Sequence, residues 1–219
     1  MSASIVLFDL DGTVSDSAPG ILASLRHAFA VNGIEPLDPA TEQQLLGPPF
    51  YESLPPIVGE HRLWPVIEAY RAHYAEAMYR STAFPGIAAV LSALRRDGRR
   101  LAIATSKPEH YAVPIVEHLG LAEQFDTIGG DDLDGSLRTK ALVIAKVLAR
   151  LGEPDRAEVV MVGDRSHDVL GARDHGIDCI GVRWGYALPG ELEAARPAKI
   201  CHTPNDLATT LGVSLSAFR

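Results

Sequence analysis

Two aspartates separated by a single residue, Asp9 and Asp11, are the first side chains in the sequence whose spacing could support chemistry. They lie in the segment FDLDGT, residues 8–13, at the end of a short apolar run. Carboxylates act as nucleophiles, as general acids and bases, and as ligands of hard cations such as Mg²⁺. Taken alone, the same letters also describe an ordinary Asp/Gly turn, so the segment needs support from elsewhere in the chain.

Three later segments supply further reactive groups. Thr105 and Ser106 follow a second apolar run, Asp164 and Asp168 follow a third, and Lys140 lies near the start of a helical pattern between them. Each group also has a simple structural explanation, because Thr caps helices, Asp is favoured at helix N-termini and an isolated Lys is usually solvated. Their order along the chain indicates one shared site if the three apolar runs are strands of one sheet.

The elements that would position these residues are short and nearly continuous in Ile, Val, Leu and Ala, which is typical of parallel strands covered on both faces. The apolar runs are residues 5–8, 101–104, 159–162 and 179–182. Helical patterns lie at 86–97, 109–119, 139–151 and 168–175, each followed by a glycine that can end a helix. The alternation predicts an α/β fold with a doubly wound, Rossmann-like parallel sheet, whose ligands bind at the carboxyl ends of the strands.

The region between the first two apolar runs has a different character. Residues 16–82 contain helical patterns, clearest at 21–31 and 63–78, and no convincing strand. Because about 65 structureless residues are improbable inside a compact domain, we expect a helical cap sub-domain inserted after the first strand. The predicted organisation is an α/β core of residues 1–15 and 83–219 and a helical cap of residues 16–82.

The composition narrows the partners. The 219 residues include 28 acidic and 20 basic side chains, a formal net charge of -8. This acidic surplus argues against a nucleic acid polymer or an anionic membrane as partner, since both attract basic surfaces. The sequence shows no apolar run of membrane-spanning length and no signal-peptide pattern, and its two cysteines are too few for a disulfide framework. A cytoplasmic protein is therefore expected.

Together these segments resemble the haloacid dehalogenase superfamily, from residue 5 to about residue 192. The most specific part of the resemblance is the D-x-D-G-T element at residues 9–13 followed by G-D-x-x-x-D at residues 163–168. The segments GPPF at 47–50, FPG at 84–86 and RWGY at 183–186 are also similar to the phosphoglycolate phosphatase and 5'-nucleotidase branches.

The resemblance implies covalent catalysis by Asp9, which would form an aspartyl-phosphate. Asp11 would protonate the leaving alcohol and then activate water. The cofactor would be Mg²⁺, held by Asp9, Asp164 and the main-chain carbonyl of Asp11. Asp168 would lie one step further out and orient Lys140 or the waters on the metal.

The resemblance also assigns the groups that bind phosphate. Thr105 and Lys140 would hold the oxygens of the transferred phosphoryl group, and Ser106 would contact the substrate where relatives commonly have Asn. Lys140 lacks the proline that follows the equivalent lysine in many relatives, so Lys107 is an alternative phosphate contact.

The branches of the superfamily differ in residues that separate their chemistry. Dehalogenases lack the second acid, which here is Asp11, and phosphonatases need a cap lysine, which residues 15–82 do not contain. A sugar phosphomutase, whose cap often carries a His-Lys pair not found here, and a non-catalytic phosphate-binding module are more distant alternatives. In the cap, Phe50 and Arg71 are the main candidate substrate contacts, followed by Tyr74 and Tyr79.

The sequence thus predicts a Mg²⁺-dependent phosphomonoester hydrolase that acts on a small phosphorylated metabolite. Phosphoglycolate is the expected substrate, with a nucleoside 5'-monophosphate as the alternative. The sequence leaves open whether the protein is a monomer or a homodimer.

Overall fold

The computed structural model describes residues 3–215, and its centre is a six-stranded parallel sheet. The strand order is β5-β4-β1-β6-β7-β8, and Ile5 of β1 pairs with Arg100 of β4 on one side and Val159 of β6 on the other. The strands are β1 (Ile5–Phe8), β4 (Arg100–Pro108), β5 (Thr127–Asp131), β6 (Val159–Gly163), β7 (Asp178–Val182) and β8 (Lys199–Cys201). The predicted doubly wound sheet is therefore confirmed, with β5 and β8 added to the four strands that the sequence indicated.

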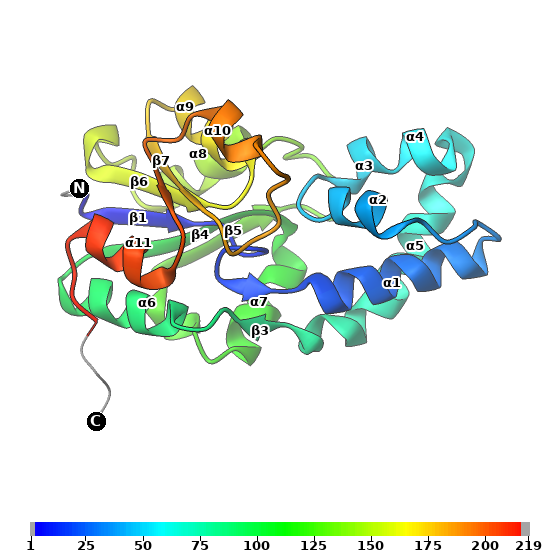
Figure 1. Cartoon of the computed structure of the whole chain (residues 1–219), viewed down its shortest axis with the longest axis horizontal. Coiled ribbons are helices and arrows are strands. Elements are labelled where there is room, and N and C mark those ends of the chain that lie inside the picture. Colours follow the sequence, from blue (N-terminus) through cyan, green and yellow to red (C-terminus); the bar gives the residue numbers. More distant parts are fainter. Residues whose placement is uncertain (1–2, 216–219) are drawn as a thin grey trace.

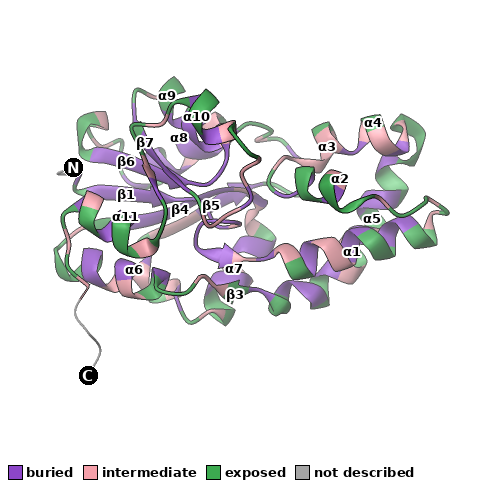
Figure 2. Cartoon of the chain, in the orientation of Figure 1, coloured by how far each residue is buried: buried purple, intermediate pink, exposed green. Residues whose placement is uncertain are grey.

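Helices cover both faces of the sheet (Figure 1) because the strands are apolar on both sides. Along β1, Val6 and Phe8 pack with one group of helices, and Ile5 and Leu7 pack with the other. The first group is α6 (Ile87–Arg96), α7 (Glu109–His118) and α11 (Pro204–Leu211); the second is α8 (Lys140–Arg150), α9 (Ser166–Asp174) and α10 (Glu191–Ala195). The chain also contains three short 3-10 helices: η1 (Met78–Arg80), η2 (Ala122–Gln124) and η3 (Arg156–Glu158). Figure 2 shows the strands as the buried centre between these layers.

Five helices form a separate lobe beyond the carboxyl ends of the strands (Figure 1). They are α1 (Ala18–Val31), α2 (Pro39–Gln44), α3 (Phe50–Ser53), α4 (Pro55–Val58) and α5 (Glu60–Ala77). The chain enters the lobe through β2 (Ser15–Asp16) and leaves it through β3 (Thr82–Ala83), and these two short strands pair antiparallel. We call this helical lobe the cap. It confirms the predicted insertion, and the limits 16–82 remain a prediction.

The two long cap helices approach each other closely at Gly20 of α1. A Cβ atom at this position would lie 2.5 Å from the carbonyl oxygen of Ala77 at the end of α5, so only glycine fits. The apolar sides of the two helices, with Leu25 and Val66 among their buried residues, then form a core within the cap. The two long cap helices are therefore packed against each other, and the strands β2 and β3 connect the cap to the core.

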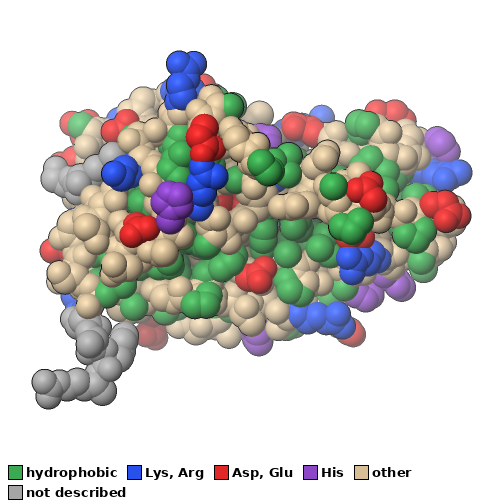
Figure 3. All heavy atoms as spheres, viewed as in Figure 1, with side chains coloured by type: hydrophobic (Ala, Val, Ile, Leu, Met, Phe, Trp, Pro, Cys, Tyr) green, Lys and Arg blue, Asp and Glu red, His purple; other side chains and the backbone are tan. Residues whose placement is uncertain are grey.

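Acidic and basic side chains are mixed on the face of the molecule that Figure 3 shows, and they do not gather by sign. Across the described residues 3–215, no helix combines the length and the hydropathy needed to cross a membrane.

Candidate active site

A buried lysine and two buried aspartates form the centre of the site. Asp9 directly follows β1, is 7% exposed, and its Oδ1 lies 2.6 Å from the Nζ atom of Lys140. The same Nζ lies 2.7 Å from Oδ1 of Asp168, near the start of α9. Lys140 begins α8, whose N-terminus is capped by the hydroxyl of Thr139. Helix α9 comes close to this point because Gly171 leaves room for the Lys140 side chain, which would lie 2.9 Å from an added Cβ.

Asp164 directly follows β6 and is enclosed by a tight cradle of backbone. Its Oδ1 accepts a hydrogen bond from the hydroxyl of Thr13 at 3.2 Å, and its Oδ2 accepts one from the backbone N–H of Tyr186 at 2.7 Å. An added Cβ would lie 2.2 Å from Oδ2 at Gly12 and 2.4 Å from it at Gly185, so neither position tolerates a side chain. Gly12 also has a φ of +85°, in the left-handed region that favours glycine.

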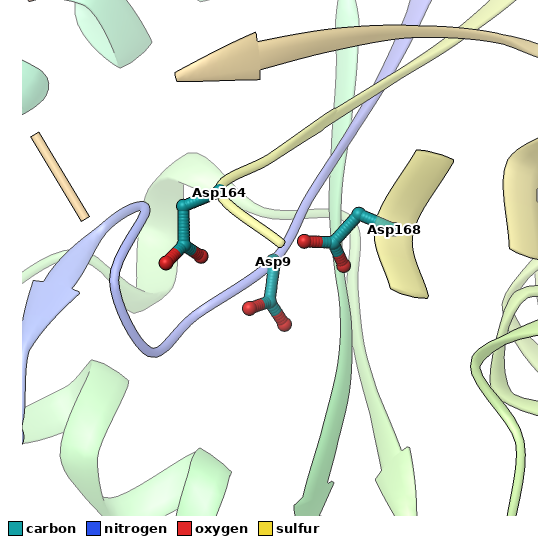
Figure 4. A group of neighbouring side chains, drawn as sticks. All are labelled: Asp9, Asp164 and Asp168. Atoms are coloured by element: carbon teal, nitrogen blue, oxygen red, sulfur yellow. The ribbon is translucent and has the colours of Figure 1, made fainter. Parts of the chain in front are cut away.

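The donor set fits a magnesium ion. One carboxylate oxygen from each of Asp9, Asp164 and Asp168 lies within 4.8 Å of the others, and Figure 4 shows the three groups gathered at the ends of β1 and β6 and the start of α9. Hard oxygen ligands are those that Mg²⁺ prefers. Asp168 is already engaged at both oxygens, by Lys140 and by the backbone N–H of Arg165 at 3.0 Å. Its contacts suit a residue that orients Lys140.

The site carries more negative charge than its lysine balances. Burial raises the pKa of Asp9 to about 6, against a lowering influence of Lys140. Burial also raises the pKa of Asp164 well above its usual range, and Asp168 and Asp9 add to the effect. Burial lowers the pKa of Lys140, but Asp168 and Asp9 outweigh it and the net pKa is raised. A cation bound among these carboxylates would offset both the burial of their charge and their mutual repulsion, which together raise the pKa values of Asp9 and Asp164.

The second acid, Asp11, has partners of its own. Its Oδ1 accepts a hydrogen bond from the hydroxyl of Ser17 at 2.6 Å, and its Oδ2 lies 2.9 Å from Nζ of Lys107. That Nζ also donates to the hydroxyl of Tyr74, on cap helix α5, at 2.8 Å. The two lysines that the sequence left as alternatives therefore serve different acids, Lys140 with Asp9 and Lys107 with Asp11.

Two adjoining cavities lie at this edge of the sheet. The smaller has a volume of about 20 Å³, and its lining contains Asp9, Asp11, Thr105, Ser106, Lys140 and Asp168 from the expected site. The larger, of about 100 Å³, lies under the cap, and Phe50, Arg71 and Tyr74 line it. Asp11, Gly47, Ser106 and Lys107 line both cavities. The structure thus brings six of the expected core residues around one small space, and three of the four expected cap residues, Phe50, Arg71 and Tyr74, around the adjoining one.

Two expected substrate contacts have different surroundings from those anticipated. The guanidinium of Arg71 donates to the carbonyl oxygen of Leu133 and, at 2.8 Å, to the hydroxyl of Tyr51. It therefore fastens the cap to a loop of the core. Tyr79 is 46% exposed, its ring packs on His118, and it is absent from the lining of both cavities. The weaker expectation for Tyr79 finds no support in this placement.

Two residues join the cap to the site: Tyr186, which the sequence indicated only as part of the segment RWGY at 183–186, and Arg165, which the sequence reasoning missed. Arg165, 6% exposed, donates to the carbonyl oxygen of Leu46 in the cap and lies 2.9 Å from Glu191. The hydroxyl of Tyr186 accepts the backbone N–H of Ser17 at 2.8 Å, where the chain enters the cap. Arg165 lies between the two acids of the G-D-x-x-x-D segment, and that position was the available signal. No sequence pattern points to its carbonyl partner.

A parallel Rossmann-like sheet with acids at its carboxyl edge and a helical cap above them is the architecture of a capped α/β enzyme. The profile of one such family, described as haloacid dehalogenase-like hydrolase, matches residues 6–182. The chain belongs to this family.

Three relatives that are similar to this chain are named for different activities. Tyrosine-protein kinase PtkA of Mycobacterium tuberculosis is 41% identical over 97% of this chain and 74% of its own length. Its solved structure matches with a TM-score of 0.85, at 40% identity over 97% of this chain and 99% of that one. A 5'-nucleotidase of Pseudomonas aeruginosa is 37% identical, covering 90% of each chain. A phosphoglycolate phosphatase of Cupriavidus necator is 34% identical over 84% of this chain and 83% of its own. Family and relatives identify the chain as an enzyme of the phosphatase type.

Proposed function

We infer that the protein is a Mg²⁺-dependent phosphomonoester hydrolase that works through an aspartyl-phosphate on Asp9. The observation that carries this inference is the arrangement around the small cavity. A buried carboxylate, Asp9, is paired with Lys140 at 2.6 Å, and a second acid, Asp11, lines the same space. A nucleophile, a phosphate-binding cation and a proton donor are the three groups that cleavage of a phosphate ester requires.

In the first step a carboxylate oxygen of Asp9 attacks phosphorus while the bond from phosphorus to the leaving oxygen breaks. Asp11 gives that oxygen a proton, so that a neutral alcohol departs. In the second step Asp11 takes a proton from water, the water oxygen bonds to phosphorus, and the Asp9 carboxylate leaves. Lys140 and Thr105 hold the phosphoryl oxygens through both steps. Asp9 and Asp164 would hold Mg²⁺, which would supply positive charge to offset the repulsion between these carboxylates and the anionic phosphate.

The substrate is a small phosphorylated metabolite. The sequence favoured phosphoglycolate over a nucleoside 5'-monophosphate, and the relatives include proteins named for each substrate. Because one relative, PtkA, is named a tyrosine-protein kinase, a tyrosine hydroxyl is a second candidate, besides water, to accept the phosphoryl group. Release of inorganic phosphate distinguishes hydrolysis from such transfer. We expect a cytoplasmic enzyme, consistent with two free, buried cysteines, and a monomer or homodimer.

The test is release of inorganic phosphate from p-nitrophenyl phosphate, with Mg²⁺ and after its removal by a chelator. We expect turnover only with Mg²⁺, and a loss of about 1,000-fold or more in Asp9→Asn because the nucleophile is gone. Asp97→Asn is the matched control, since Asp97 is 50% exposed and pairs with Arg99 at the surface. Full activity of Asp9→Asn, or equal activity without metal, would contradict the proposed mechanism.

A further inference from the structure

The larger cavity adjoins the small cavity in which the proposed mechanism places the phosphoryl group. Asp11, the proposed proton donor, is one of four residues that line both cavities. The remaining lining comes mostly from the cap, from α1, α3, α5 and the residues between α2 and α3, and otherwise from Pro108, Tyr111 and Asp131 of the core. A substrate with its phosphate at Asp9 would therefore extend its alcohol portion into this space.

The cavity has a wall of aromatic rings. Phe50 and Tyr70 meet edge to face at 4.7 Å, Tyr70 and Tyr74 stack at 5.1 Å, and Tyr74 meets Tyr111 edge to face at 5.5 Å. The row runs without a break from the cap to α7 of the core. Burial raises the pKa of Tyr70 and Tyr74 well above the usual range, so both hydroxyls stay neutral. Such a wall favours a flat, uncharged group that can pack against rings.

The charged residues of the lining balance one another. Two acids, Asp11 and Asp131, and two bases, Arg71 and Lys107, line the cavity. Lys107 is paired with Asp11, and the Arg71 guanidinium is fastened to the carbonyl oxygen of Leu133. Asp131 is 3% exposed and its Oδ1 accepts only backbone N–H groups among its printed contacts, from residues 132 and 137. A carboxylate entering this space would meet two acids and two bases, so the lining offers it no net positive charge.

We propose that the cavity selects a neutral alcohol that carries a planar ring, as a nucleoside or a phenol does, and discriminates against a small anionic alcohol such as glycolate. The proposal rests on the proposed phosphatase function and reverses the order of substrates that the sequence favoured.

The test compares kcat/KM with Mg²⁺ for pairs of substrates that differ in one property. Adenosine 5'-monophosphate against ribose 5-phosphate isolates the base, and ethyl phosphate against phosphoglycolate isolates the carboxylate. Phenyl phosphate forms a separate arm that distinguishes a phenol from a nucleoside. We expect adenosine 5'-monophosphate to exceed ribose 5-phosphate, its counterpart without an aromatic base, by roughly 10-fold or more, the usual gain from stacking on an aromatic side chain. Because phenol is a better leaving group than ethanol, phenyl phosphate is judged by how far a variant of the aromatic wall lowers its kcat/KM. Ethyl phosphate should be cleaved better than phosphoglycolate.

A variant connects this preference to the wall. Tyr70→Leu should reduce the ratio of ring-bearing to ring-free substrates, because it removes the central ring of the row. Phe50→Leu, at a half-buried position, serves the same purpose should Tyr70→Leu not fold. Tyr79→Leu is the matched control, since Tyr79 is 46% exposed and lies outside the cavity lining.

Phosphoglycolate cleaved as well as the ring-bearing substrates would overturn the proposal, as would Tyr70→Leu lowering all substrates in equal proportion. Failure of the proposed function gives a different result, the absence of Mg²⁺-dependent turnover with every substrate.

Discussion

Replacing Lys140 by methionine tests whether this lysine neutralises the buried acids. Its side chain is 4% exposed and contacts Asp9 at 2.6 Å and Asp168 at 2.7 Å. At an effective dielectric constant of about 20, Coulomb's law gives about 6 kcal/mol for each contact. Desolvation of the ammonium and the carboxylates offsets much of this, and removing one partner of a buried pair typically costs about 3–5 kcal/mol. We expect that loss in the free energy of unfolding of the metal-free protein.

The assay is thermal unfolding of the metal-free protein at about pH 8, followed by the same measurement with Mg²⁺. For a domain of this size about 3–5 kcal/mol corresponds to roughly 6–20 °C in Tm. The loss should be smaller at about pH 5, because the pKa of Asp9 is already raised to about 6 and rises further when the cation is removed, so the carboxyl is then protonated and neutral. Mg²⁺ should recover part of the stability but not the activity.

Lys146→Met is the matched control on the same helix. Lys146 has a 22% exposed side chain and pairs with Glu109 at 3.0 Å and Asp132 at 3.3 Å near the surface. Pairs of this kind contribute about 1 kcal/mol or less. If Lys140→Met lowers Tm by no more than Lys146→Met does, the reasoning about buried charge is wrong.

Three further predictions concern the neighbouring residues. Tyr74→Phe removes the hydroxyl that accepts a hydrogen bond from Lys107, the partner of the proposed proton donor Asp11. Cleavage of alkyl phosphates, which needs a proton donor, should therefore slow roughly 10-fold more than cleavage of p-nitrophenyl phosphate. Equal slowing of both substrates in steady-state kinetics would contradict this. Gly185→Ala places a Cβ 2.4 Å from Oδ2 of Asp164, and calorimetry should show Mg²⁺ binding weakened by roughly 10-fold or more; unchanged affinity would disprove the cradle. Because the pKa of Asp9 is raised to about 6 in the folded state, its contribution to stability is present below about pH 4 and lost as pH rises through about 6. Urea unfolding without metal should show this decline, and Asp9→Asn should lessen it.

The sheet and the gathering of the site were accessible from sequence because parallel strands end at a common edge. Asp9 and Asp164 follow two adjacent strands, β1 and β6, and the apolar runs of both strands are unmistakable. Strand β5 escaped prediction because its sequence, TIGGD, contains two glycines and no apolar run. Gly129 and Gly130 are needed there, since an added Cβ would lie 2.4 Å from Val147 or from the backbone of Lys107. Close packing, which the linear pattern does not record, determined those residues.

The sequence did not indicate which groups the individual side chains contact. The family resemblance left Lys140 and Lys107 as alternative phosphate contacts, and only the folded chain shows that Lys107 pairs with Asp11 and Lys140 with Asp9. Arg71 was a candidate substrate contact, and the structure adds that its guanidinium, at the lining of the larger cavity, also donates to a backbone carbonyl of the core. A carbonyl partner has no sequence signature, because every residue carries one.

The two cavities differ in the charge of the residues around them. At the small cavity, Lys140 contacts the carboxylates of Asp9 and Asp168, and Asp164 lies close to both, so a bound cation would favour entry of the phosphate. In the larger cavity acids and bases are equal in number and aromatic rings form the wall, so the lining has no net positive charge to attract a further anion. The proposed metal requirement and the proposed substrate preference therefore have separate physical causes. A variant in the aromatic wall, such as Tyr70→Leu, should change the choice of alcohol without changing Mg²⁺ affinity, and a coupled change in both would show that the two cavities act as one.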